Sequence, residues 1–196
     1  MNSIKKMISE DLFRYTGGKS ISFLKKIRLY GYQYMKIWRK ANYFIKKNKM
    51  LALFYEVLMY RKSVKYGFQI SPYATIGHGL YIGHFGTIIV GNEVTIGDNV
   101  NISPNVVIGR ANRGSKKGSP TIGSNVWIGS GAVITGKVII GDNVLIAPNS
   151  FVNIDIPSNS IVVGNPAVIH YSIDAVDKYV ENIILKEKIW LLFLLL

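Results

Sequence analysis

The chain has three histidines, and their neighbours in the sequence indicate which of them can do chemistry. His84 lies between Gly83 and Gly86, in an interruption of an otherwise regular repeat, where small residues leave room for a substrate. An imidazole acts as a general base near neutral pH with little adjustment of its pKa. His78 lies within the regular repeat and His170 follows the last expected strands, so we expect both to face solvent. His84 is therefore the predicted base.

The composition excludes several other kinds of chemistry. The 196 residues include no cysteine, which excludes disulfides, thiolate-ligated metal centres and a cysteine nucleophile. The three histidines are not grouped at the close spacing that a metal site needs, so no metal is predicted. Any group transfer is thus expected to be direct, without a cysteinyl intermediate.

A second candidate site is a basic segment, residues 110–120, which interrupts the repeat between Ile108 and Ile122. It holds four cations and no acid, namely Arg110, Arg113, Lys116 and Lys117. Guanidinium and ammonium groups bind phosphate through charge-assisted hydrogen bonds. The segment therefore predicts a site for a polyanion such as a nucleotide phosphate; the alternative is a solvated loop without a ligand.

Both candidates are positioned by a six-residue repeat that begins at Ile70. An aliphatic residue recurs every six positions, with slips after Ile82 and Ile108, at Ile70, Ile76, Ile82, Val90, Ile96, Ile102, Ile108, Ile122, Ile128, Ile134, Ile140, Ile146 and Val152. Such a hexad pattern is the signature of a parallel β-helix, here of about five coils with three hexads each. Asparagine recurs at the turns, at positions 99, 125 and 143, because it tolerates left-handed backbone angles.

The first third of the chain differs from the rest in its charge. The formal net charge is +13, and residues 1–66 carry all of it, with sixteen Lys and Arg against three acids. Residues 67–196 hold eight residues of each sign. We expect three parts: a basic helical region at 1–66, a β-helix at 67–170, and a tail at 171–196 that is helical.

Within 20–65, apolar and aromatic residues recur at helical spacing and basic residues fill the positions between them. Gly17, Gly18 and Gly31 are expected to break the helices, and Asn48 to begin the last one. Two interpretations stay open. The helices either lie on anionic lipid, to which cations beside aromatic residues are suited, or they pack as a cap on the repeat. No nucleic-acid-reading module accompanies the charge, so nucleic acid is not an expected partner.

The ends of the chain carry no clear targeting signal. The start lacks a continuous apolar segment followed by a small-residue cleavage site. The longest apolar run, residues 189–196, is far shorter than the ~20 residues that a spanning helix needs. The expected location is the cytoplasm, at the inner face of the membrane if the basic helices bind lipid.

Two stretches carry a family resemblance. Residues 67–91, GFQISPYATIGHGLYIGHFGTIIVG, resemble the start of the β-helix domain of serine acetyltransferases, and 161–169, IVVGNPAVI, resemble its closing segment. The same stretches are similar to related O-acetyltransferases of surface-polysaccharide synthesis, including the colanic acid type. The resemblance implies that the β-helix is left-handed, which the repeat alone does not determine.

The resemblance also implies an activity, the transfer of acetyl from acetyl-CoA to a hydroxyl in a homotrimer that binds CoA between neighbouring prisms. His84 matches the family's base, and backbone N–H groups near Gly109 would stabilise the oxyanion. Positions matching the family's CoA-binding stretches are Gly109, Gly129, Ser130, Gly164, Asn165 and Pro166. To these the loop charges add Arg113, Lys116 and Lys117 as expected partners of the CoA phosphates.

Four departures from the family pattern bear on the acceptor, and one of them is Pro104-Asn105, where relatives often carry His-Gly. Gln69 and Gly83 stand where serine acetyltransferases carry carboxylates, and Ser119 replaces a histidine before Pro120. A site without these groups has little to hold an ammonium and a carboxylate. We therefore expect a sugar hydroxyl of a surface polysaccharide or its precursor as acceptor. The alternatives are L-serine, as in cysteine biosynthesis, and a non-catalytic trimeric scaffold.

Overall fold

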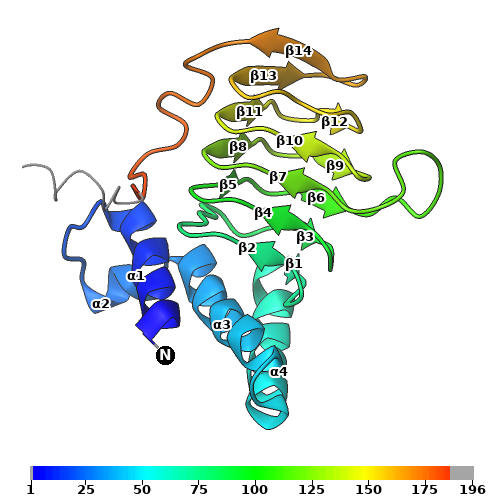
Figure 1. Cartoon of the computed structure of the whole chain (residues 1–196). Coiled ribbons are helices and arrows are strands. Elements are labelled where there is room, and N and C mark those ends of the chain that lie inside the picture. Colours follow the sequence, from blue (N-terminus) through cyan, green and yellow to red (C-terminus); the bar gives the residue numbers. More distant parts are fainter. Residues whose placement is uncertain (1, 186–196) are drawn as a thin grey trace, which may run out of the picture.

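The computed structural model of the chain describes residues 2–185 and combines a helical base with a tall stack of short strands (Figure 1). The helices are α1 (Asn2–Thr16), α2 (Phe23–Ile27), α3 (Tyr30–Ile45) and α4 (Lys49–Tyr66). The strands are β1 (Phe68–Ile70), β2 (Thr75–Ile76), β3 (Ile88–Val90), β4 (Thr95–Ile96), β5 (Asn101–Ile102), β6 (Val106–Gly109), β7 (Thr121–Ile122), β8 (Val126–Ile128), β9 (Val133–Thr135), β10 (Ile139–Ile140), β11 (Val144–Ile146), β12 (Phe151–Val152), β13 (Ser160–Val163) and β14 (Val168–Tyr171).

The strands form a left-handed parallel β-helix with three sheets. Sheet A has the order β1-β3-β6-β9-β12, sheet B the order β10-β7-β4-β2, and sheet C the order β14-β13-β11-β8-β5. The hexad positions stack in register. In sheet A, the successive paired neighbours on adjacent strands are Ile70, Val90, Ile108 and Ile134. All thirteen predicted aliphatic positions are buried in one continuous core, which confirms the predicted fold.

The turns between sheets use the asparagines as predicted. Asn99, Asn125 and Asn143 have φ values of 56°, 55° and 54°. Asn99 Nδ2 also donates to Asn125 Oδ1 at 3.2 Å, so that successive coils are joined at this corner. The turn residues therefore support both the bend and the stacking of the coils.

The helices close one end of the solenoid (Figure 1). Tyr34, Met35 and Trp38 of α3 are buried and belong to the same core cluster as the first strands. Trp38 Nε1 donates to the carbonyl oxygen of Ser71 at 3.0 Å, at the end of the first coil's strand β1. The helical region is thus a cap on the β-helix, one of the two interpretations of the sequence, and contact with lipid stays a prediction.

The expected helix boundaries are partly correct. Helix α1 ends before Gly17, and Asn48 is the N-cap of α4, since its side chain accepts a hydrogen bond from Leu51 N at 3.0 Å. Gly31, in contrast, lies inside α3 and does not break it. A Cβ at this position would collide with the carbonyl oxygen of Ile82, so the glycine allows close packing rather than a break.

The expectation of a helical tail is wrong for the part of the tail that the structure describes. After β14, which runs antiparallel to β13, residues 172–185 form turns that descend along the solenoid to α1 (Figure 1). Val176 and Val180 pack against Leu145 in a small second cluster, and Lys178 has a φ of 61°, which is incompatible with a helix. The Leu-rich run 189–196 lies outside the described residues.

Among the helices of residues 2–185, none combines the length and the apolar composition that a membrane span requires.

Candidate functional site

His84 is exposed on the connection between sheet C and sheet A of the first coil, and both ends of this connection are fixed by the helical cap. On one side, the hydroxyl of Tyr15 in α1 accepts from Ile82 N at 2.9 Å and donates to Ile82 O at 3.0 Å. On the other side, Gly86 N donates to the carbonyl oxygen of Tyr66, the last residue of α4, at 2.9 Å. The cap therefore positions His84, although nothing local in the sequence connects Tyr15 to it.

No hydrogen bond of the His84 side chain to another residue of the described range 2–185 is found. Glu93, an acid of the next coil, does not orient the imidazole, because it follows β3 at the opposite edge of sheet A, where its carboxylate pairs with Arg110 at 3.1 Å. The prediction for His78 is wrong in part. Its Nδ1 contacts a carboxylate oxygen of Glu10 in α1, so this histidine joins the cap to the solenoid. His170 is exposed on β14, as expected.

The other predicted site residues occupy two edges of sheet A. Gly129, Ser130 and the turn Gly164–Pro166 lie with His84 at the edge where the chain passes from sheet C to sheet A. Backbone hydrogen bonds join the connections along this edge, such as Asn105 N to Thr87 O and Asn149 N to Ser130 O. Gly109 and the loop 110–120 lie at the opposite edge, where the chain leaves sheet A for sheet B. Within one chain the predicted residues are thus separated by the width of a sheet.

The loop 110–120 projects from the solenoid as a long excursion (Figure 1), closed at its base by two hydrogen bonds between Ala111 and Gly118, each 3.0 Å long. Two of its four cations are already paired. Arg110 contacts Glu93, and Lys116 Nζ lies 3.0 Å from a carboxylate oxygen of Asp155. Arg113 and Lys117 are exposed and form no ion pair with the described part of the chain, so these two have their charges available for a ligand.

The glycines of the predicted CoA stretches differ in how closely they are packed. A Cβ at Gly129 would lie 2.7 Å from the backbone nitrogen of Pro148, so this residue has to be glycine for the coils to stack. A Cβ at Gly109 would meet nothing closer than 4.0 Å. Gly109 is therefore not required by packing within the chain, and its open surroundings leave its backbone accessible to a ligand.

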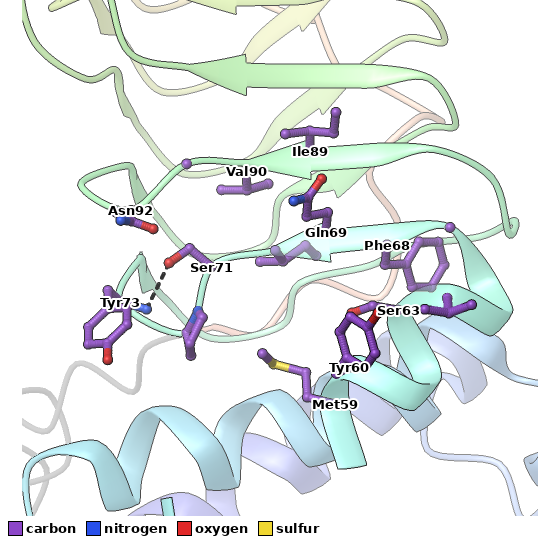
Figure 2. Close-up of a pocket in the computed structure, with 15 residues that line it drawn as sticks. Met59, Tyr60, Ser63, Phe68, Gln69, Ser71, Tyr73, Ile89, Val90 and Asn92 are labelled. Carbon is purple, nitrogen blue, oxygen red and sulfur yellow. Dashed lines mark hydrogen bonds between the residues drawn. The ribbon is translucent and has the colours of Figure 1, made fainter. Parts of the chain in front are cut away.

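A cavity of about 640 Å³ lies on the outer face of sheet A, between the first two coils and the end of α4 (Figure 2). Gln69 projects into it from β1, beside Ile89 of β3, with Tyr60 of α4 and Tyr73 also on its walls (Figure 2). Every side chain that lines it within residues 2–185 is uncharged. The cavity thus contains the position at which the family resemblance places a carboxylate, and its chemistry is neutral and partly aromatic.

The fold and the repeat define a class: the chain is a hexapeptide-repeat β-helix protein that resembles serine O-acetyltransferases. The family model for bacterial transferase hexapeptide repeats matches residues 119–153. Serine acetyltransferase 4 of Arabidopsis thaliana is 34% identical over 152 residues, which are 77% of this chain and 42% of that protein.

Solved structures agree with this class. The serine acetyltransferase of Neisseria gonorrhoeae in complex with serine superposes with a TM-score of 0.72 and 29% identity, over 86% of this chain and 69% of that one. A serine acetyltransferase in complex with CoA gives a TM-score of 0.71 and 27% identity, over 86% and 70%. The chain spans about half the length of the curated relatives it matches, 42% of the Arabidopsis protein and 59% of the serine acetyltransferase of Helicobacter pylori.

Proposed function

We propose that the protein is an acetyl-CoA-dependent O-acetyltransferase. The observation that carries the proposal is His84, exposed on a connection fixed at both ends, in a β-helix similar to serine acetyltransferases over most of its length. A similar structure solved with CoA supports acetyl-CoA as the co-substrate.

In the proposed reaction the acceptor oxygen attacks the carbonyl carbon of the acetyl thioester while His84 takes the proton from that oxygen. Backbone N–H groups near Gly109 stabilise the oxyanion that forms. The C–S bond then breaks, the CoA thiolate leaves, and the imidazolium returns its proton to the thiolate. Arg113 and Lys117, the two loop cations without an ion pair in the described range, bind the CoA phosphates, and Lys116 contributes less because of Asp155.

The candidate groups lie at two edges of sheet A, and this separation supports assembly as a homotrimer. A neighbouring prism that presents its loop edge to the His84 edge would bring Gly109 and the loop cations of one subunit toward His84 of the next. Sedimentation or light scattering tests the assembly, and a monomer that retains full activity would contradict it.

L-serine is the acceptor that the comparisons favour, because the relatives and structures reported above are serine acetyltransferases and one of them was solved with serine. None of those proteins supports the expected polysaccharide acceptor. One observation nevertheless favours a neutral hydroxyl compound such as a sugar as a second candidate: the described residues that line the cavity around Gln69, which do not include His84, have no charged side chain to hold an ammonium or a carboxylate.

Release of free thiol from acetyl-CoA tests the activity. His84→Ala should lower turnover by ~10²–10⁴-fold, the usual contribution of a positioned general base. His170→Ala is the matched control, since His170 is exposed on β14, and it should retain full turnover. Equal turnover of the two variants would exclude His84 as the base.

The same assay identifies the acceptor when L-serine is compared with sugars and nucleotide sugars. Serine-dependent release supports the function of the relatives, and sugar-dependent release supports the second candidate. Calorimetry that detects no CoA binding to an intact assembly would instead support the non-catalytic scaffold.

A further inference from the structure

A second cavity, of about 270 Å³, lies away from sheet A, where the end of α1 meets the solenoid and the descending tail. The tail is joined to α1 here, since Asn182 Nδ2 donates to the carbonyl oxygen of Arg14 at 3.1 Å. The cavity walls are mostly polar, and the lining residues are Arg14, Tyr15, Tyr81, Asn101, Lys178, Tyr179, Glu181 and Asn182. Three parts of the chain that are distant in sequence therefore build one polar chamber.

Arg14 on the wall of this cavity is a buried cation with unused donors. Its exposed fraction is 3%, and one terminal amino group donates to Asn101 Oδ1. Its Nε and Nη1 atoms are buried and have no hydrogen-bond partner within residues 2–185. Burial lowers the pKa of the guanidinium to about 10, so it stays protonated at neutral pH. A buried guanidinium with unpaired donors destabilises the folded protein unless an anion or ordered water completes its hydrogen bonds.

The nearest buried carboxylate cannot serve as the partner of Arg14. Both oxygens of Asp11 accept hydrogen bonds from Arg39, from Nε and Nη2 at 3.0 Å each, and one also accepts from Leu80 N. Glu181 lines the cavity but is exposed and forms no ion pair with Arg14. Among the described residues, Arg14 and Arg39 thus share the one buried carboxylate, that of Asp11, and its side-chain hydrogen bonds go to Arg39.

We propose that this cavity is a binding site for a small oxyanion, a carboxylate or a phosphate. The Arg14 guanidinium supplies charge-assisted hydrogen bonds from the wall, and Lys178 adds a second cation there. The site is separate from the proposed acetyl-transfer site and does not depend on that function. Its position has a structural consequence, because Tyr15, the neighbour of Arg14, holds the backbone of Ile82 two residues before His84.

Thermal unfolding of the full chain in sodium phosphate or sodium acetate, against sodium chloride at equal ionic strength, tests the proposal. Saturable stabilisation by phosphate or acetate is expected, and the two salts distinguish the two classes of oxyanion. Hydrogen exchange at the Ile82 amide should slow by at least severalfold when the anion binds.

Arg14→Gln removes the charge and leaves an amide that can still bond Asn101. This variant should be no less stable than the parent in chloride and should lose the response to the oxyanion. Lys137→Gln, on the solenoid away from the cavity, is the control and should respond as the parent does. If Arg14→Gln does not fold, Lys178→Gln tests the proposal in its place. This variant should bind the oxyanion with an affinity at least severalfold lower than that of the parent.

The proposal is overturned if no stabilisation by phosphate or acetate saturates below about 50 mM, or if Arg14→Gln responds as strongly as the parent. The second result would place the anion elsewhere, for example on the loop 110–120. A crystal structure with only ordered water on Arg14 in saturating phosphate and acetate would overturn it as well.

Discussion

Single residues decide how closely the cap and the solenoid approach each other, and Gly31 is the clearest case. Gly31→Ala should destabilise the protein by about 2 kcal/mol, because overpacking against the backbone of Ile82 outweighs the ~1 kcal/mol that alanine gains in a helix. Urea unfolding measures the difference. Gly91→Ala is the control, since a Cβ there meets only ordinary contacts at 3.6 Å and beyond. A Gly31→Ala variant as stable as the parent would contradict the packing argument.

The buried pair between Asp11 and Arg39 is the second residue-scale determinant. Arg39 also donates to the carbonyl oxygens of Ile76 and Gly77, each at 2.6 Å, so it connects α1, α3 and the first coil. Arg39→Met should cost ~3–5 kcal/mol by leaving a buried carboxylate unpaired. In a double-mutant cycle measured by denaturation, the variant that combines Arg39→Met with Asp11→Leu should lose less free energy of unfolding than the two single variants lose together. Additive losses would show that the pair is not coupled.

These residues show what the sequence does not reveal. Arg39 belongs to a basic pattern that is typical of a solvated helix face, and its burial depends on an acid 28 residues away. Glu10 and Asp11 are two of only three acids in residues 1–66, and this rarity is the one sequence signal from which their structural role could have been predicted. Tyr15 gives no such signal, because only the assembled fold brings its hydroxyl to Ile82.

At the scale of elements, prediction succeeded where the pattern is local and repeated. Each hexad specifies its own strand and turn, so the aliphatic positions and the turn asparagines predicted the β-helix without long-range information. The tail was predicted wrongly because its structure depends on contacts with Leu145 and on backbone angles such as that of Lys178. The cavity around Gln69 likewise requires α4 and sheet A together, which a linear pattern does not place.

The extruded loop 110–120 is anchored in a way that depends on pH. Asp155 accepts from Ile139 N at 2.9 Å and from Lys116 at 3.0 Å, and these bonds lower the pKa of its carboxyl, the backbone bond most. Since the folded pKa is depressed, the anchoring is complete above the ordinary value of 3.8 and is lost as the pH falls through the lower folded value.

Protection factors of the Ala111 and Gly118 amides, which close the loop, measure this anchoring. They should fall in the parent as the pH drops below 3.8, and Asp155→Asn should show the lower protection already at neutral pH. Lys117→Gln is the control, because Lys117 has no ion pair in the described range. Equal protection in Asp155→Asn and the parent at pH 7 would rule out the anchor.

At the scale of the whole molecule, charge and apolar surface gather on the helical cap. The net charge of +13 is carried by residues 1–66. The buried residues Ala52, Met59 and Tyr66 define the inner face of α4. The opposite face is an exposed apolar stripe, with exposed fractions between 52% and 84%, made of Met50, Leu53, Phe54, Val57, Tyr60 and Val64. An apolar stripe on the outer side of a helix needs a partner.

The charges around the stripe favour an anionic membrane surface as that partner. Lys49, Arg61, Lys62 and Lys65 lie on the same helix against a single acid, Glu56. A second copy of this cap would bring like charges together, whereas anionic lipid neutralises them and accepts the apolar side chains. Tyr60 and Val64 also line the cavity around Gln69, so the same contact would bring that cavity to the lipid surface.

Because the chain has no cysteine, a single environment-sensitive dye at Val57→Cys reports on the stripe without interference. Vesicles that contain phosphatidylserine should shift its emission to the blue, and pure phosphatidylcholine should do so far less. A dye at Ile139→Cys, exposed on β10 of the solenoid, is the control and should not shift. Leu53→Gln together with Val57→Gln should lower vesicle binding by roughly tenfold for each side chain removed from lipid. A changed oligomeric state in that double variant, with no change in vesicle binding, would assign the stripe to a second copy of the chain instead.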